Sequence, residues 1–272
     1  AVVMGTSIGF AVAPLLADGA LGTVGTWSWS MGEPLHAVAP LGGEDVNLHA
    51  IGLGQAGEGS IVEIDGSATV VSTHVLGTGI VAGLSEANAS VSSIQHGLAG
   101  GTTFHLFIGT DRGLFIVDTA TARDDTTGAW RFFYTPDDSP IPTDVDELRS
   151  LPLGSNDNPA EIRDLVLDGP SSSNAQALWF GTPSGLHKLD LNDDFIEHSG
   201  LYVHPGVDGK LSKETNNIHA IHPTGDELLI GSQWGLWALA GDYAAVYGVQ
   251  DQTRLPGEIV ALATSVDEGN VS

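Results

Sequence analysis

Arginine and histidine side chains occupy matching places in several short apolar segments of the sequence. His36, Arg163 and His219 each stand second in a segment that begins and ends with an aliphatic residue, and Ser92 holds the same place in a fourth. If these segments converge, a guanidinium and two imidazoles could hold an anion, and the imidazoles alone could hold a metal ion. The alternative is that these side chains pack between neighbouring units or bond to nearby backbone, since this histidine spacing is not a metal motif in itself. The segments are Leu35–Val38, Val91–Ile94, Ile162–Leu165 and Ile218–Ile221, with Ile259–Leu262, where Val260 stands second, as a fifth.

Carboxylates near the same segments offer a second kind of chemistry. Glu161 and Glu258 take equivalent positions immediately before two of these segments, and Asp164 follows Arg163. Two such carboxylates in one pocket could serve as the acid and the base or nucleophile of a glycoside hydrolase. The chain holds 34 acidic residues, so the coincidence also arises by chance, and no catalytic residue is assigned.

Acidic pairs form a further group of candidate ligands. They are Glu44–Asp45, Asp124–Asp125, Asp137–Asp138 and Asp193–Asp194. All are expected in loops, where a solvated surface is the ordinary role and Ca²⁺ is the ion that carboxylates would bind. None matches the spaced Asp-x-Asp-x-Asp-Gly calcium loop, so we predict no cofactor, with Ca²⁺ as the alternative.

The elements that must position these residues are hairpins marked by a repeated Gly-Thr/Ser-x-x-Gly motif. Its clear copies are Gly5–Gly9, Gly109–Gly113, Gly181–Gly185 and Gly231–Gly235, and a degenerate copy surrounds Gly52. In each copy an apolar strand leads in and an alternating strand leads out, which is typical of a β-hairpin with a short loop. We expect the first glycine and the Thr or Ser to start the tight turn, and the second glycine to supply a positive φ.

Trp234 stands apart among the turn residues. It precedes the second glycine of its motif, where no other copy has an aromatic residue. An exposed tryptophan there could stack on a sugar or contact a protein, and packing onto the next unit is the alternative. His187, beside Lys188, is expected on an exposed strand. The ligand-binding set that the sequence suggests is therefore His36, Ser92, Arg163, His219 and Trp234.

Four strands per unit predict the blades of a β-propeller. An apolar segment precedes each hairpin and a further strand follows it, and units of roughly 40–50 residues are usual for propeller blades. The predicted fold class is therefore all-β, a five-bladed β-propeller with four-stranded antiparallel blades in a single domain of residues 1–272. The blades cover roughly 258–272 with 1–30, then 35–76, 91–135, 161–204 and 217–249, with a surface insertion within 121–158.

The two ends of the sequence complement each other. Residues 258–263 form a segment with no hairpin after it, and the first hairpin has no segment before it. The stretch from Glu258 to Ser272 continued by Ala1 to Thr6 spans 21 residues, against 22 from Glu161 to Thr182. We therefore expect the C-terminal strand to complete the first blade and close the ring, which leaves no open sheet edge. A fragment cut from a longer array is the competing interpretation.

The hairpin copies resemble a known propeller repeat. Leu178–Leu189 and Leu106–Asp118 best show the pattern apolar-apolar-Gly-Thr-x-x-Gly-Leu, which is similar to the repeat in sensor domains of bacterial two-component regulators. The copy around Gly52 departs from it. The resemblance implies a propeller that senses a ligand or contacts a protein, without a catalytic set to transfer. Similar repeats also occur in lyases and other enzymes.

The charge of the chain restricts its partners. Nine Lys and Arg stand against 34 Asp and Glu, a formal net charge of −25. Such a surface repels itself at low salt, and at about 1 M salt a Debye length of about 3 Å screens the repulsion, which favours a high-salt environment over an ordinary acidic surface. Nucleic acid is not expected as a partner, because no basic patch can meet its phosphates. The chain has no Cys and no apolar run of about 18 residues, so neither disulfides nor a membrane span is predicted.

These observations favour a non-catalytic recognition or assembly module of a larger surface structure, such as a cell envelope, an adhesin or a viral spike, adapted to high salt. Its partners would be proteins of that assembly or a surface glycan, and its location extracellular or surface-exposed. The alternative is a carbohydrate-active or lyase-type enzyme with its site at the mouth of the propeller channel. Two carboxylates, or a histidine with a carboxylate, gathered in one open pocket would favour the enzyme.

Overall fold

The protein is all-β in its computed structural model. The structure describes residues 2–14, 16, 22–23, 27–31, 35–41, 48–54, 59–65, 67–75, 84, 89–99, 103–118, 131–134, 147–151, 161–168, 176–192, 195–203, 216–224, 227–233, 235–240, 245–247 and 258. The regular elements within these residues are β-strands, which confirms the predicted fold class at this level.

The strands form five separate sheets, here numbered in chain order. The first sheet contains β1 (Val2–Thr6), β2 (Gly9–Ala13) and β3 (Ser28–Met31). The second contains β4 (Ala37–Leu41), β5 (Leu48–Leu53), β6 (Gly59–Ile64) and β7 (Val70–Val75). The third contains β8 (Val91–Ala99), β9 (Thr103–Thr110), β10 (Leu114–Asp118), β11 (Arg131–Tyr134) and β12 (Glu147–Ser150). The fourth contains β13 (Asp164–Asp168), β14 (Ala177–Thr182), β15 (Gly185–Asn192) and β16 (Phe195–Tyr202), and the fifth β17 (Ile218–Thr224), β18 (Glu227–Ser232), β19 (Gly235–Ala240) and β20 (Ala245–Tyr247).

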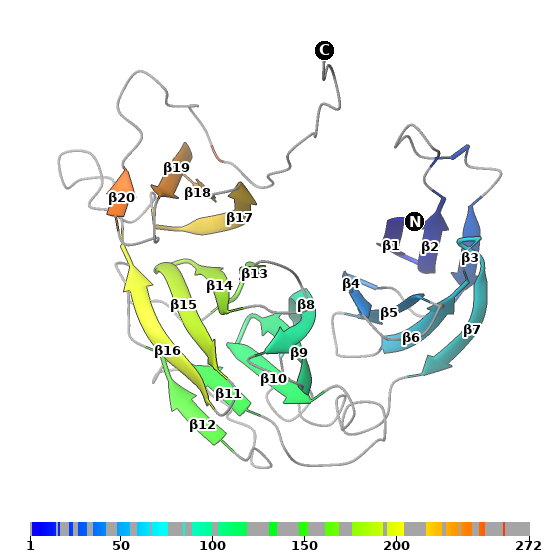
Figure 1. Cartoon of the computed structure of the whole chain (residues 1–272), viewed down its shortest axis with the longest axis horizontal. Coiled ribbons are helices and arrows are strands. Elements are labelled where there is room, and N and C mark those ends of the chain that lie inside the picture. Colours follow the sequence, from blue (N-terminus) through cyan, green and yellow to red (C-terminus); the bar gives the residue numbers. More distant parts are fainter. Residues whose placement is uncertain are drawn as a thin grey trace.

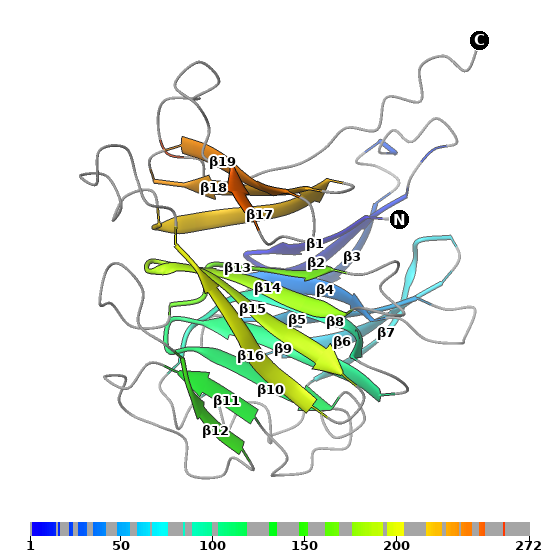
Figure 2. The same ribbon diagram turned by 60° about the vertical axis from the view of Figure 1, so that its left-hand side comes forward.

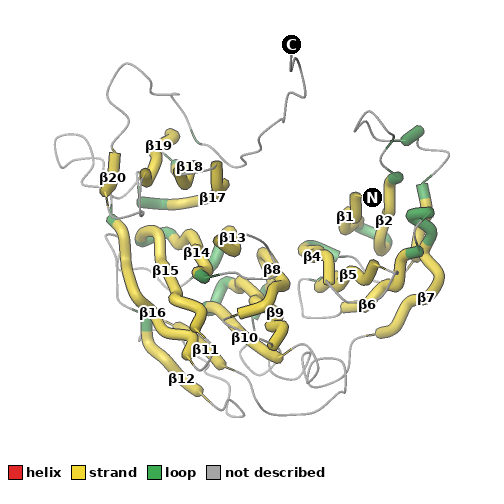
Figure 3. Tube along the Cα trace, viewed as in Figure 1, coloured by secondary structure: helices red, strands yellow, loops and turns green. Residues whose placement is uncertain are grey.

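The sheets follow one another around a common centre (Figure 1). β4, β8, β13 and β17 lie nearest the centre, and the later strands of each sheet lie farther out. Figure 2 shows the same sheets turned by 60°, and Figure 3 shows that strands and loops make up the described part. The first and fifth sheets face each other across an interval that no described strand fills.

Hydrophobic residues fill the boundary between each pair of successive sheets. Neighbouring residues of one strand serve opposite boundaries, because side chains alternate across a strand. In β9, for example, Leu106 and Ile108 face the second sheet, and Phe107 faces the fourth. Separate clusters join the first sheet to the second, the second to the third, the third to the fourth, and the fourth to the fifth. Within the described residues the three middle sheets are therefore packed on both faces, and the first and fifth sheets each pack against one neighbour.

The motif hairpins form as predicted, and the hydroxyl of the Thr or Ser closes each turn. Oγ1 of Thr110 donates to the carbonyl oxygen of Gly113 at 2.8 Å and accepts from the N–H of Arg112 at 3.1 Å. Gly113 has a φ of +145°, which explains the glycine at this position. Thr6, Thr182 and Ser232 make the same bond to the carbonyl oxygens of Gly9, Gly185 and Gly235 at 2.9–3.0 Å.

The first glycine of the motif serves a different purpose from the one expected. A Cβ on Gly109 would lie 2.7 Å from Cγ2 of Ile162, and one on Gly181 would lie 2.5 Å from Cγ2 of Ile218. Ile162 lies two residues before β13 and Ile218 is the first residue of β17, so both neighbours belong to the start of the next sheet. The first glycine thus lets two sheets approach closely, and only the second is a turn residue.

Two sheets depart from the predicted four antiparallel strands. The third sheet has a fifth strand, β12, which runs parallel to β11 and comes from the region predicted to be a surface insertion. Nε of Arg131 lies 3.3 Å from Oε2 of Glu147 across this pair, so charged side chains help to hold the added strand. The first sheet has three strands among the described residues. The fourth strand expected for it, residues 258–263, lies outside the described residues except for Glu258.

Candidate functional site

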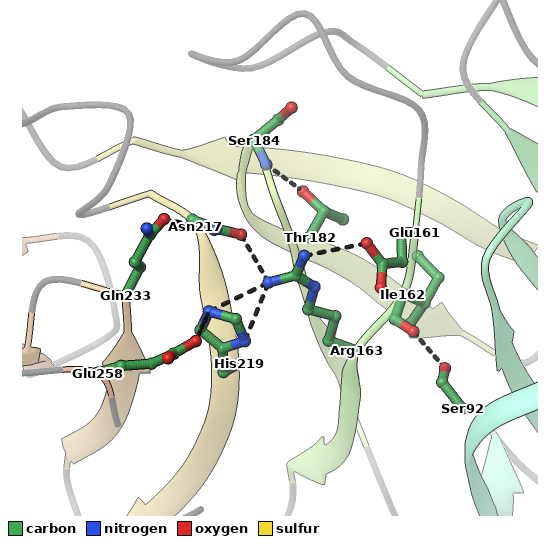
Figure 4. A network of polar contacts seen from close by, with 10 residues as sticks. All are labelled: Ser92, Glu161, Ile162, Arg163, Thr182, Ser184, Asn217, His219, Gln233 and Glu258. Atoms are coloured by element: carbon green, nitrogen blue, oxygen red, sulfur yellow. Dashed lines mark hydrogen bonds and ion pairs between the residues drawn. The ribbon is translucent and has the colours of Figure 1, made fainter. Parts of the chain in front are cut away.

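Arg163 and His219 meet where the innermost strands of the fourth and fifth sheets begin (Figure 4). Arg163 directly precedes β13, and His219 is the second residue of β17. Nη1 of Arg163 lies 2.7 Å from Oδ1 of Asn217 and 2.9 Å from Nδ1 of His219. Two of the predicted site residues are thus in direct contact across a sheet boundary.

The guanidinium of Arg163 also holds a carboxylate. Nη2 donates to Oε2 of Glu161 at 3.0 Å. The side chain of Arg163 is 22% exposed and that of Glu161 43%. An ion pair this accessible to solvent contributes only about 0.2–1 kcal/mol. Little free energy therefore separates this pairing from one with another anion.

His219 is held neutral between Arg163 and Glu258. Burial, and secondly the charge of Arg163, lower the pKa of the imidazole, while the carboxylates of Glu258 and Glu161 partly offset the shift. Nε2 of His219 lies 3.0 Å from Oε1 of Glu258. Nη1 of Arg163 is 3.1 Å from Nε2 as well, but a nitrogen that donates to Glu258 carries the proton and cannot accept. We therefore assign the Nε2–H tautomer, with the Nδ1 lone pair directed at Arg163.

The contact between Arg163 and Asn217 recurs one sheet further on. Asn217 stands two residues before His219, just as Glu258 stands two residues before Val260. His219 therefore reaches Glu258 as Arg163 reaches Asn217. In both contacts, the second residue of one apolar segment reaches the residue just before the next apolar segment along the chain.

Ser92 connects the third sheet to the fourth. Its hydroxyl lies 3.0 Å from the carbonyl oxygen of Gly109 and also contacts the carbonyl oxygen of Ile162. Gln95 adds a second link, because its Nε2 donates to the carbonyl oxygen of Leu165 at 3.1 Å. The hydroxyl of Ser92 is thus engaged with the backbone of two sheets.

His36 and Trp234 complete the predicted set. His36 precedes β4 and is exposed, and its backbone N–H donates to the carbonyl oxygen of Leu53 at 2.9 Å. Trp234 lies outside the described residues. The structure therefore brings Arg163 and His219 together and gives Ser92 a related place in the next boundary, while His36 occupies a more open position.

Sequence reasoning missed Asn217 and Gln233. Nδ2 of Asn217 donates to Oε1 of Gln233 at 2.8 Å, and the N–H of Gln233 donates to the carbonyl oxygen of Asn217 at 3.0 Å. Asp111 contacts Ser90 in the same way, through its N–H at 3.1 Å and its carboxylate at 2.7 Å. The third residue of the motif thus contacts the residue two places before the predicted site residue of the same sheet, His219 or Ser92. Aligning the repeats would have identified this pair.

Asp164 is a buried carboxylate that fastens two sheets. Oδ1 accepts from the N–H of Leu165 at 2.9 Å, and Oδ2 accepts from the N–H of Ile221 in β17 at 2.7 Å. Burial raises the pKa of Asp164 to about 6, although both backbone bonds and the nearby His222 lower it. Both oxygens are occupied by backbone donors, so the carboxylate links the fourth sheet to the fifth.

A second polar cluster lies between the third and fourth sheets. His187 in β15 is 2% exposed, so the expectation of an exposed strand is wrong: β15 lies between β14 and β16 in its sheet, and the sheet is packed against neighbouring sheets. The ring stacks on Phe180 with centroids 4.9 Å apart, and its Nδ1 lies 3.1 Å from Nε2 of His198. Burial, and secondly the charge of His198, lower the pKa of His187 to about 3, and burial also lowers that of His198. Two neutral rings share one N–H···N bond here.

Metal ligands do not gather in the part of the chain that the structure describes: it contains no group of three or more His, Cys, Asp or Glu that could hold an ion. The four acidic pairs considered for Ca²⁺ all lie outside that part, so the Ca²⁺ alternative stays a prediction. No helix among the described residues is long and apolar enough to cross a membrane.

Comparisons with known proteins give distant structural likenesses. No protein-family model matches the sequence, and no curated protein matches it either. A candidate 6-phosphogluconolactonase from Bacteroides uniformis is similar with a TM-score of 0.44 and 11% identity, over 94% of this chain and 80% of that one. Apo AztD from Citrobacter koseri has a TM-score of 0.41 and 12% identity, over 94% and 61% of the two chains. The extracellular domain of a candidate hybrid two-component system from B. thetaiotaomicron has a TM-score of 0.33 and 14% identity, over 80% and 31%.

Proposed function

We propose that the chain closes into a five-bladed β-propeller whose first blade is completed by residues 258–263. β1 is intermediate or exposed along its whole length, whereas β14, the corresponding strand of the fourth sheet, is buried throughout. A strand laid along β1 would cover this surface. The contact of Glu258 with His219 supports the proposal, because it repeats the contact of Asn217 with Arg163.

The register of two other sheets gives the pairing that closure requires. Asp164 pairs with Gly181, and Ala220 pairs with Gly231. In each pair one residue directly follows a predicted site residue, Arg163 or His219, and the other is the first glycine of the motif. The same register would place Ala261 opposite Gly5 and Ala263 opposite Val3. A hydrophobic cluster between the fifth and first sheets would then complete the ring.

We infer that this propeller is a non-catalytic recognition or assembly module of a surface structure that works in high salt. The observation that carries the inference is that the groups capable of acid–base chemistry near the centre are engaged in contacts between or within sheets. Glu161 contacts Arg163, Glu258 contacts His219, and both oxygens of Asp164 accept from backbone. A catalytic acid or base must be directed at its substrate, whereas each of these carboxylates is directed at a neighbouring group of the protein.

Binding without turnover is the test. The protein would be incubated in 2 M KCl with neutral and acidic polysaccharides, and both retention and product release would be measured. The proposal predicts retention of a glycan without new reducing ends and without the ultraviolet absorbance of an unsaturated uronate. Continuous release of either product would contradict it and support the enzyme.

The second candidate, a carbohydrate-active or lyase-type enzyme, is favoured by one observation: His219 contacts a carboxylate, that of Glu258. A carboxylate that orients a neutral imidazole is a common arrangement for a general base. The nitrogen that would take the substrate proton, Nδ1, instead accepts from Arg163. If the enzyme is correct, His219→Gln removes turnover while His36→Gln, an exposed imidazole outside the network, does not.

A further inference from the structure

We propose that Arg163 binds the carboxylate of a uronic acid residue in exchange for Glu161. This inference depends on the proposed recognition function and names the class of ligand that the module takes. Glu161 then acts as a built-in competitor that occupies the arginine while no ligand is bound.

The scarcity of cations makes the position of Arg163 informative. The chain has nine Lys and Arg against 34 Asp and Glu. One of these few cations stands at the start of the innermost strand of the fourth sheet, beside the start of the fifth (Figure 4). Its side chain retains 22% exposure, so it is neither buried as a purely internal pair nor freely solvated.

The contacts of Arg163 leave capacity for a second anion contact. Nη1 donates to Asn217 and His219, and Nη2 donates once to Glu161. Within the described residues these contacts use three of five guanidinium protons. A carboxylate that takes two parallel N–H bonds is the preferred partner of this fork, and Glu161 provides only one oxygen. An incoming carboxylate could therefore gain a bond that Glu161 does not make.

The groups around Arg163 suit a hydroxyl-rich ligand. Asn217 and Gln233 provide amides, and Gln233 is exposed. The carboxylate of Glu258 is 51% exposed beside His219. Amide and carboxylate oxygens accept hydrogen bonds from sugar hydroxyls, so a sugar acid matches both the cation and its polar surroundings.

Calorimetric titration in 2 M KCl tests the proposal with D-galacturonate and D-glucuronate, against D-galactose and D-glucose as neutral counterparts. The wild-type chain should bind at least one uronate and neither neutral sugar measurably. Arg163→Gln should weaken uronate binding more than about tenfold, the effect of losing a charge-assisted hydrogen bond. Glu161→Gln should strengthen it about two- to fivefold, because an exposed competing ion pair is removed.

Matched controls come from the outer edge of the third sheet. Oε1 of Glu147 and Nη2 of Arg149 form an exposed ion pair there, 2.5 Å apart, so Arg149→Gln and Glu147→Gln change charge in the same way away from the centre and should leave uronate binding unchanged. If Arg163→Gln does not fold, Glu161→Gln decides alone. No uronate binding, equal binding of neutral sugars, or weaker binding by Glu161→Gln overturns the inference. Glycan retention without a uronate preference would leave the proposed function standing, whereas turnover of polygalacturonate would refute that function independently.

Discussion

The buried imidazole of His187 leads to a specific prediction about acid stability. Its pKa is lowered to about 3 from an ordinary 6.5, chiefly by burial. Between pH 6.5 and pH 3 the imidazole of His187 is therefore protonated in the unfolded chain and neutral in the folded one. The contribution of His187 to the free energy of unfolding is complete above pH 6.5 and is lost as the pH falls towards 3. Between pH 7.5 and pH 5.0 the loss is about 2 kcal/mol, since one pKa unit corresponds to about 1.4 kcal/mol.

Urea unfolding in 2 M KCl at these two pH values measures the effect. His187→Gln removes the titrating group and keeps a polar side chain, so its free energy of unfolding should fall about 2 kcal/mol less than that of the wild type over this interval. His36→Gln, which alters an exposed imidazole, should behave like the wild type. Comparing the change with pH, not the absolute stability, cancels any general cost of the substitution. A pH dependence of His187→Gln equal to that of the wild type would refute the reasoning.

Three further predictions concern packing, a buried carboxylate and salt. Gly181→Ala would place a Cβ 2.5 Å from Cγ2 of Ile218 and should cost about 1–3 kcal/mol of unfolding free energy; an unchanged urea midpoint would show that the sheets do not meet so closely. Asp164 should show the opposite pH dependence to His187, because burial raises the pKa of its carboxyl group from 3.8 to about 6. Its contribution to the free energy of unfolding is fully present below pH 3.8 and is lost as the pH rises through 6. Between pH 7 and pH 5 the free energy of unfolding of Asp164→Asn should therefore rise less, or fall more, than that of the wild type. Identical pH dependences of the two proteins in urea titrations would contradict this. The net charge of −25 predicts a thermal midpoint that rises from 0.1 M to 2 M KCl, and a midpoint that stays level or falls would contradict adaptation to high salt.

The hairpins could be predicted from the sequence because their signal is local. The Thr hydroxyl and the second glycine act within one turn, as Thr110 and Gly113 do, so a five-residue pattern identifies them. The same regularity aligns the inner segments and predicts that Arg163 and His219 lie near each other. Their actual contact also involves Asn217, whose role depends on the neighbouring sheet.

Features that depend on contact between distant segments could not be predicted. The first motif glycine is required by Ile162 or Ile218 of the next sheet, which lies far along the chain from the turn. His187 is a polar residue beside Lys188 in the sequence, yet it is 2% exposed and stacks on Phe180, which belongs to the cluster between the third and fourth sheets. The strand β12 pairs in parallel with β11 from within a polar stretch that carries no strong strand signal. The first two outcomes depend on a neighbouring sheet, and the third depends on pairing with β11 along the edge of the same sheet.

Closure of the ring is the central structural claim, and an engineered disulfide tests it most directly. The chain has no Cys, so Val3→Cys combined with Ala263→Cys introduces one defined pair. Directly opposed residues of antiparallel strands have Cα atoms about 4.5–5.5 Å apart, within the range that a disulfide spans. If the ring closes, this pair should crosslink rapidly within one chain. Val3→Cys with Thr264→Cys should crosslink little, because their side chains would point to opposite faces of the sheet. Equal crosslinking of both pairs, none for the first, or crosslinks only between chains would contradict closure by the C-terminal strand.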